Sequence, residues 1–243
     1  MNPPRRRGGP TLVGIIGPPA SGKTTLAVTL AAALRAPVVR PRQAIRRYLA
    51  QHPPLTPLFP AVNDLGWVPD AAMRLAVRAE LDAIPDDVHT VLLENLPWDA
   101  LQLADLHRIA GTNDACLLLL HLGAPDEIIS VRGSSRRVCR ACGQPNRPQA
   151  PTTTAKTGPT SCAQCGADLA LRADDQPDVL AKRVQIYYRR TATILPLVTA
   201  IGIPILAIDS TRLPEHVGQE AFDFIVREAR SYTHDLTNFD AAA

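Results

Sequence analysis

The most constraining feature of this chain is the stretch GPPASGKT at 17–24, which matches the pattern G-x-x-x-x-G-K-[ST]. It follows the apolar run TLVGIIG (11–17), typical of a buried parallel strand, and precedes strong helix formers at 24–35. Gly17 and Gly22 let the backbone turn so that its N–H groups point at phosphate oxygens, and the helix adds its positive dipole end. The order strand, loop, helix therefore predicts a binding site for nucleotide phosphates.

Within this loop, Lys23 is expected to reach the β- and γ-phosphates, and the Thr24 hydroxyl is placed to bind Mg²⁺. The second sign of such a site is an acid at the end of a neighbouring strand, which orders the water around Mg²⁺. Glu94, at the end of LLE (92–94), can be that acid, although it can also be an ordinary strand-end carboxylate. The loop is shared by ATPases, GTPases and kinases, and the lack of an N-K-x-D motif disfavours a GTPase. The predicted ATP-binding residues are Gly17, Pro18, Pro19, Ala20, Ser21, Gly22, Lys23, Thr24 and Thr25.

Apolar runs alternate with helix-forming segments along the chain. Strand-like runs begin at 11, 90, 115 and 203, and helices are predicted at 24–35, 70–83, 99–111, 178–201 and 214–230. Continuously apolar strands separated by helices predict a parallel sheet with helices on both faces, an α/β fold.

Finer expectations concern the ends of these elements. We expect Asp99 to cap its helix, Gly111 to end it, and Pro196 to interrupt the long helix of 178–201. The 23 prolines concentrate at 53–60 and 145–159, and irregular structure is expected at both places.

Two cysteine pairs, VCRACG at 138–143 and SCAQCG at 161–166, fit the spacing of a four-thiolate zinc site. The predicted ligands are Cys139, Cys142, Cys162 and Cys165. A glycine after each pair permits the tight turn that aims backbone N–H groups at the sulfurs. Because four thiolates leave no open coordination position, the Zn²⁺ would be structural. A redox function needs only one reactive pair, so two matched pairs favour zinc.

The alternative for the same segment is nucleic-acid binding, since four arginines lie around the first cysteine pair: Arg132, Arg136, Arg137 and Arg140. Those arginines can equally face a triphosphate. The net charge of +3 does not establish a nucleic-acid partner. The fifth cysteine, Cys116, is expected in the core, and His121, in an apolar strand, is expected to be a core residue rather than a metal ligand.

No apolar run reaches the length of a membrane span, and the N-terminus MNPPRRRGGP lacks the apolar stretch of a signal peptide. We therefore expect a cytoplasmic protein with no membrane partner.

The segments GPPASGKTT, VRGSSRRVCRACG and CAQCGADLALRADDQPDVLAKRVQIYYRRTATILPL resemble an adenylate kinase with a zinc-bearing lid. The similarity covers about residues 11–212 and is most specific over 128–195. It implies a P-loop NTPase-type three-layer fold that carries a lid over ATP and an insert over the acceptor nucleotide. The implied divisions are a disordered basic N-terminus (1–10), core segments (11–37, 70–130 and 176–230), an acceptor-binding insert (38–69), a zinc lid (131–175) and a C-terminal tail (231–243).

The resemblance also implies residue roles. Arg132 and Arg136 match the arginines at the lid base that contact ATP. Arg172 and Arg183 match the pair that clamps the transferring phosphates, and DD at 174–175 matches the hinge-side aspartates. Phosphoryl transfer depends mainly on positioning and charge neutralisation, which arginines and Mg²⁺ supply.

The acceptor side departs from the family pattern. The family's D-G-F-P-R reads ENLPW at 94–98, so Trp98 stands where the arginine that binds the acceptor phosphate belongs. Gln102 matches the glutamine that reads the acceptor's adenine, and Arg46 matches the arginine of the family's T-G-D-x-x-R, whose threonine and glycine are missing. Trp98 can stack on a planar group but cannot replace a bidentate arginine, and Arg42 or Arg47 could supply that contact.

The resemblance implies transfer of the γ-phosphoryl group of Mg·ATP to a nucleoside monophosphate, with AMP as the default acceptor. Two alternatives stay open: a kinase for a different phosphorylated or nucleoside-like acceptor, and a non-catalytic relative that binds nucleotides or nucleic acid. The expected partners are ATP and a small-molecule acceptor, nucleic acid is disfavoured, and the chain is expected to be a monomer.

Overall fold

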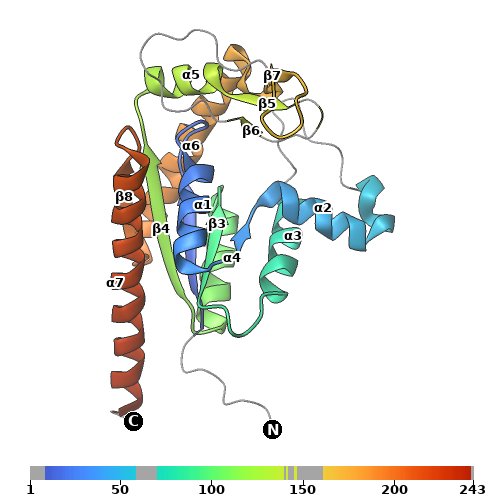
Figure 1. Ribbon diagram of the computed structural model, residues 1–243. Coiled ribbons are helices and arrows are strands. Elements are labelled where there is room, and N and C mark those ends of the chain that lie inside the picture. Colours follow the sequence, from blue (N-terminus) through green and yellow to red (C-terminus); the bar gives the residue numbers. More distant parts are fainter. Residues whose placement is uncertain (1–8, 59–69, 140, 142–144, 147–160, 242–243) are drawn as a thin grey trace.

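The computed structural model describes residues 9–58, 70–139, 141, 145–146 and 161–241. Its centre is a parallel sheet of five strands in the order β2-β3-β1-β4-β8 (Figure 1). The strands are β1 (Thr11–Ile16), β2 (Val38–Val39), β3 (Thr90–Glu94), β4 (Cys116–Gly123) and β8 (Ile205–Asp209). The predicted α/β sheet is thereby confirmed.

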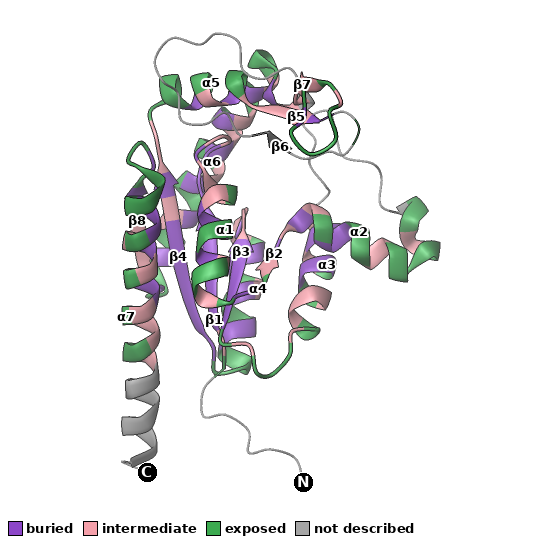
Figure 2. Cartoon of the chain, in the orientation of Figure 1, coloured by how far each residue is buried: buried purple, intermediate pink, exposed green. Residues whose placement is uncertain are grey.

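Helices cover both faces of this sheet. They are α1 (Lys23–Leu34), α2 (Pro41–Gln51), α3 (Asp70–Asp82), α4 (Ala100–Thr112), α5 (Asp126–Ser135), α6 (Pro177–Ala200) and α7 (Pro214–Ala241), with short 3-10 turns η1 (Pro53–Leu58) and η2 (Ala173–Asp175). Successive β1 residues face opposite sides, so Val13 packs with the helices α1 and α7, whereas Leu12 packs on the other face. The buried strands form the middle layer in Figure 2.

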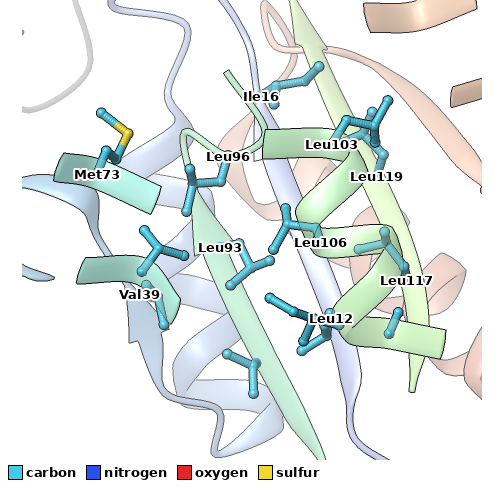
Figure 3. Close-up of a cluster of buried hydrophobic side chains, with 14 of the residues drawn as sticks. Leu12, Ile16, Val39, Met73, Leu93, Leu96, Leu103, Leu106, Leu117 and Leu119 are labelled. Carbon is cyan, nitrogen blue, oxygen red and sulfur yellow. The ribbon is translucent and has the colours of Figure 1, made fainter. Parts of the chain in front are cut away.

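The core on the second face lies between the sheet and the helices α3, α4 and α6. In Figure 3, Leu12, Leu93 and Leu117 of the strands face Leu103 and Leu106 of α4. All five side chains are at most 8% exposed. This packing fixes α4 on the face of the sheet. It thereby also holds the loop that joins β3 to α4 at the carboxyl edge of the sheet.

Several predicted element ends are wrong. Helix α4 continues through Gly111 to Thr112, with Asn113 as its C-cap, because its buried stripe holds the last turn against the sheet. Helix α6 runs without a break through Pro196, since Ile194 and Val198 are buried on either side of it. The proline-rich segment that was expected to be irregular forms a 3-10 turn over Pro53–Leu58.

One further difference concerns the last helix. Helix α7 extends past the predicted end at residue 230 to Ala241. Most of the proline-rich segment 145–159 lies outside the described residues. No helix in the described part of the chain is both long and apolar enough to cross a membrane.

A second, smaller sheet lies between α5 and α6 in the sequence. Its antiparallel strands are β5 (Arg137–Cys139), β6 (Pro145–Asn146) and β7 (Leu169–Leu171), in the order β6-β5-β7. Figure 1 places it beyond the carboxyl ends of the central strands, while α2 and α3 stand to one side of the sheet. Ligands of open parallel sheets bind at this carboxyl edge, so both units border the position expected for a site.

Candidate active site

The loop between β1 and α1 has the shape that its sequence predicts. Gly22 has φ 95° and Ala20 φ 61°, so the chain reverses through two left-handed residues before the helix begins. A Cβ atom at Gly17 would lie 2.8 Å from the Leu122 carbonyl oxygen and 2.6 Å from the buried Ser21 hydroxyl, so no side chain fits there. The loop therefore presents backbone, and the start of α1, to a ligand.

Lys23, the first residue of α1, folds back over this loop. Its Nζ donates hydrogen bonds to the carbonyl oxygens of Gly17 and Pro18, both at 2.7 Å. The pKa of Lys23 is lowered to about 7, mainly by burial; Glu94 opposes this shift, while Arg183 and Arg136 contribute to it. The two arginines thus lie near enough to Lys23 to affect its protonation, and an anion at this position would favour the charged lysine.

Thr24 and Glu94 meet at the carboxyl edge of the sheet. The Thr24 hydroxyl donates a hydrogen bond to Glu94 Oε1, across the gap from α1 to the end of β3. Hydroxyl and carboxylate oxygens are ligands that Mg²⁺ accepts directly or through water, so this pair fits the predicted metal. Arg40 binds the other oxygen of Glu94, with Nε 2.7 Å from Oε2. No motif marks Arg40; its only signal in the sequence is its place between a short apolar run and Pro41.

Three arginines converge on a single carboxylate, that of Asp174 in η2. Oδ2 of Asp174 lies 2.8 Å from Nη2 of Arg42, 2.9 Å from Nη2 of Arg172 and 3.4 Å from Nη1 of Arg183. Next to them, Arg136 binds both oxygens of the buried Asp175, with Nε at 2.6 Å from Oδ2. These four arginines and two aspartates are here called the arginine cluster.

The arginine cluster carries more positive than negative charge. The pKa values of Arg172 and Arg183 are both lowered, that of Arg183 to about 10. Burial is the main cause, Asp174 opposes it, and Arg42 and the neighbouring arginines contribute to the lowering. Although burial raises the pKa of Asp174, Arg172 and Arg42 outweigh that effect and lower it. Guanidinium groups crowded beyond their counter-charges favour a polyanion such as a nucleotide phosphate.

Arg132 does not join the arginine cluster. Its Nη2 donates to the carbonyl oxygen of Ser210, just after β8, at 2.8 Å. The structure therefore brings Arg136, Arg172 and Arg183 together and places Arg132 on the β8 side of the same edge.

The predicted acceptor residues form a separate group around Trp98. The guanidinium carbon of Arg190, in α6, lies 4.9 Å from the centre of the half-buried Trp98 ring, within cation–π range. Gln102 is 4% exposed. Its Oε1 accepts a hydrogen bond from the backbone N–H of Trp98 at 2.8 Å, and its Nε2 donates to Met73 Sδ at 3.4 Å. Arg46 is exposed on α2. Arg190 lies in the segment that resembles the family, but nothing in the sequence marks its contact with Trp98.

Asp99 starts the helix beside this group. Its side chain accepts from the Gln102 backbone N–H at 2.8 Å, which confirms the predicted N-cap of α4.

Three of the predicted zinc ligands lie together. The Sγ atoms of Cys139, Cys162 and Cys165 are within 4.8 Å of one another, and Cys142 lies outside the described residues. The N–H of Gln164 donates to Cys162 Sγ at 3.4 Å, and Gly166 has φ 72°. Converging thiols with a backbone donor aimed at one sulfur fit a structural zinc ion.

The fifth cysteine and the strand histidine take no part in that cluster. Cys116 is buried, as predicted, and burial raises the pKa of its thiol to about 11, which makes it unreactive. His121 is half-buried in β4, and burial lowers its pKa.

No protein-family model matches the chain. Individual curated proteins, however, are similar to it in sequence. The adenylate kinase of Salinispora tropica is 33% identical over 225 residues, which cover 90% of this chain and 98% of the relative. The adenylate kinase of Symbiobacterium thermophilum is 31% identical over 195 residues, 78% of this chain and 87% of the relative, and that of Streptomyces coelicolor is 26% identical over 88% and 98%. Two relatives above 30% identity, aligned over most of both chains, show that this chain belongs to the adenylate kinase family.

Proposed function

We propose that this protein transfers the γ-phosphoryl group of Mg·ATP to AMP. The observation that carries the proposal is the series of contacts that runs from the phosphate-binding loop to the arginine cluster. Thr24 binds Glu94, Glu94 binds Arg40, and Arg42, two residues further along the chain, binds Asp174. A loop for the donor phosphates and an excess of guanidinium groups beside it are the parts that phosphoryl transfer requires. The relatives' name, adenylate kinase, makes AMP the default acceptor.

In this mechanism, residues Gly17 to Thr25 bind ATP. The backbone of this loop and the side chain of Lys23 hold the β- and γ-phosphates. An oxygen of the acceptor phosphate attacks the γ-phosphorus as the bond to the β,γ-bridging oxygen breaks, so that two molecules of ADP form. Arg172 and Arg183 neutralise the charge on the transferring group, while Arg132 and Arg136 hold the ATP phosphates from the lid side. Mg²⁺, when bound near Thr24 and Glu94, supplies further charge neutralisation.

The small sheet with its cysteines is proposed to be a lid over ATP. A zinc ion held by Cys139, Cys142, Cys162 and Cys165 would fix the lid's shape without taking part in the chemistry. A closed lid excludes water, which would otherwise compete with the acceptor for the phosphoryl group. The divisions into core, lid and acceptor insert, the cytoplasmic location and the monomeric state stay predictions.

The acceptor is proposed to bind between α2, α3 and the loop that carries Trp98, near Arg46 and Gln102. Trp98 favours a second candidate, a kinase whose acceptor is not AMP, because an indole next to Arg190 offers a flat surface where the family has a phosphate-binding arginine. A base or another planar group could stack there.

The test is a panel of acceptors incubated with the protein, ATP and Mg²⁺, with ADP formation as the readout. Rapid transfer to AMP supports the first candidate, and transfer only to another acceptor supports the second. Transfer to none of them, while ATP still binds, would refute the enzyme function.

A further inference from the structure

The replacement of arginine by Trp98 leaves the acceptor phosphate without its usual partner. Arg190 does not simply fill that position, since its guanidinium group lies over the Trp98 ring. Its Nη1 is also 3.6 Å from Asp70 Oδ2 and 3.9 Å from Asp99 Oδ2, so two carboxylates already oppose its charge. A replacement cation is better sought on α2, which carries Arg42, Arg46 and Arg47.

These three arginines lie on two sides of α2. The buried residues Pro41, Ala44 and Ile45 define the face of the helix that packs on the core. Residues four apart share a helix face, so Arg42 and Arg46 lie together on one side of that packed face.

Arg47 lies on the other side. Its Nε is 3.1 Å from Oε1 of Glu80 in α3, and it lines a separate pocket of about 580 Å³ with Tyr48 and Ile84. Arg47 is therefore directed away from the arginine cluster.

Arg42 is directed into the arginine cluster. It shares Oδ2 of Asp174 with Arg172 and Arg183, the two residues proposed to clamp the transferring phosphoryl group. Arg42 is the one member of the cluster that comes from the acceptor-side insert, 132 positions from Asp174 in the sequence. Three guanidinium groups share this one carboxylate, and such a concentration of positive charge favours a further anion, such as a phosphate.

We propose that Arg42 binds the phosphate of the acceptor, in place of the arginine that Trp98 replaces. In the family pattern position 42 is a glycine, so this contact comes from a different element. Without acceptor, Asp174 holds Arg42 close to the clamp; with acceptor, Arg42 exchanges a carboxylate oxygen for a phosphate oxygen. The proposal rests on the proposed function, because it assumes a phosphorylated acceptor.

The test compares Arg42→Ala with Arg47→Ala, a matched loss of one arginine from the same helix. Binding of AMP, adenosine and ATP is measured by titration calorimetry, and the KM values for AMP and ATP by ADP formation. Arg42→Ala should weaken AMP binding about tenfold or more, the usual cost of a lost charged hydrogen bond. Adenosine and ATP should bind it as they bind the wild type, Arg47→Ala should bind all three normally, and Arg42→Lys should recover part of the AMP affinity.

Two results would overturn the proposal. One is AMP binding by Arg42→Ala as tight as by Arg47→Ala. The other is an equal loss for AMP and ATP, which would make Arg42 only a structural link between α2 and η2. A wild type that binds AMP without transferring a phosphoryl group would refute the proposed function, yet the binding comparison would still decide the role of Arg42.

Discussion

The donor and acceptor sides of this molecule differ in how closely they follow the adenylate kinase pattern. On the donor side, the phosphate-binding loop has the predicted shape and Thr24 meets Glu94, while Arg136, matched to a lid-base arginine, binds Asp175. On the acceptor side, Trp98 lies under Arg190, and Arg42 reaches across to Asp174. On the proposed roles, the groups that would neutralise the transferring phosphoryl charge match the family pattern, whereas the residues proposed for the acceptor depart from it.

The largest effect is expected from Lys23→Met, which breaks the donor side. Removing one preorganised charge at the transferring phosphates should lower kcat for ADP formation by about 10³-fold. AMP binding, measured by calorimetry, should change little because the acceptor group lies elsewhere. A variant that keeps more than a tenth of the wild-type rate would contradict the role of Lys23.

A smaller effect, on stability, is expected from Asp174→Asn, which changes the carboxylate that Arg42 of the acceptor side shares with Arg172 and Arg183. The substitution leaves three arginines without their shared charge, so the free energy of unfolding should fall by about 1–3 kcal/mol in urea denaturation. Mg·ATP should restore part of it, since phosphates oppose the same arginines. Asp178→Asn, on the exposed start of α6, is the control; equal stability of both variants would show that the arginine cluster needs no carboxylate.

Removal of the proposed zinc ion should change the KM for ATP more than the KM for AMP. The purified protein should contain one zinc ion per chain, and a chelator or Cys165→Ser should raise the KM for ATP by about tenfold, since the lid carries Arg136. The KM for AMP should change by less. A zinc content well below one per chain, with all thiols titrating, would contradict the metal site.

The smallest expected effect is a proton linkage at Lys23. Because the pKa of Lys23 is about 7 in the free protein, most of the lysine is neutral at pH 8, and phosphate oxygens favour its charged form. ATP binding at pH 8 should therefore take up close to one proton, as seen by calorimetry in buffers of different ionisation enthalpy. Lys23→Arg, always charged, should show none, and equal uptake by both proteins would exclude Lys23 as the source.

The comparison also separates what the sequence could predict from what it could not. The loop after β1, the cap at Asp99 and the meeting of three cysteines follow from local pattern and spacing, and the structure bears them out. The passage of α4 through Gly111 and of α6 through Pro196 was missed, because tertiary packing outweighs the local tendency of these residues to end a helix.

Contacts between side chains far apart in the sequence were the second kind of feature that could not be predicted. The contacts of Arg42 with Asp174 and of Arg190 with Trp98 join residues far apart in the sequence, and no motif marks either of them. The sequence offered Arg42 and Arg47 as equal candidates for the missing phosphate contact. Only the helix face that each arginine occupies separates them.

The most direct test of the central claim is the initial rate of ADP formation with ATP and AMP varied independently in the presence of Mg²⁺. An adenylate kinase with an intact donor side and an altered acceptor side should show a rate that saturates in both nucleotides and yields two ADP per AMP consumed. ATP consumption that is absent, or that does not depend on AMP or any other monophosphate, would contradict the account.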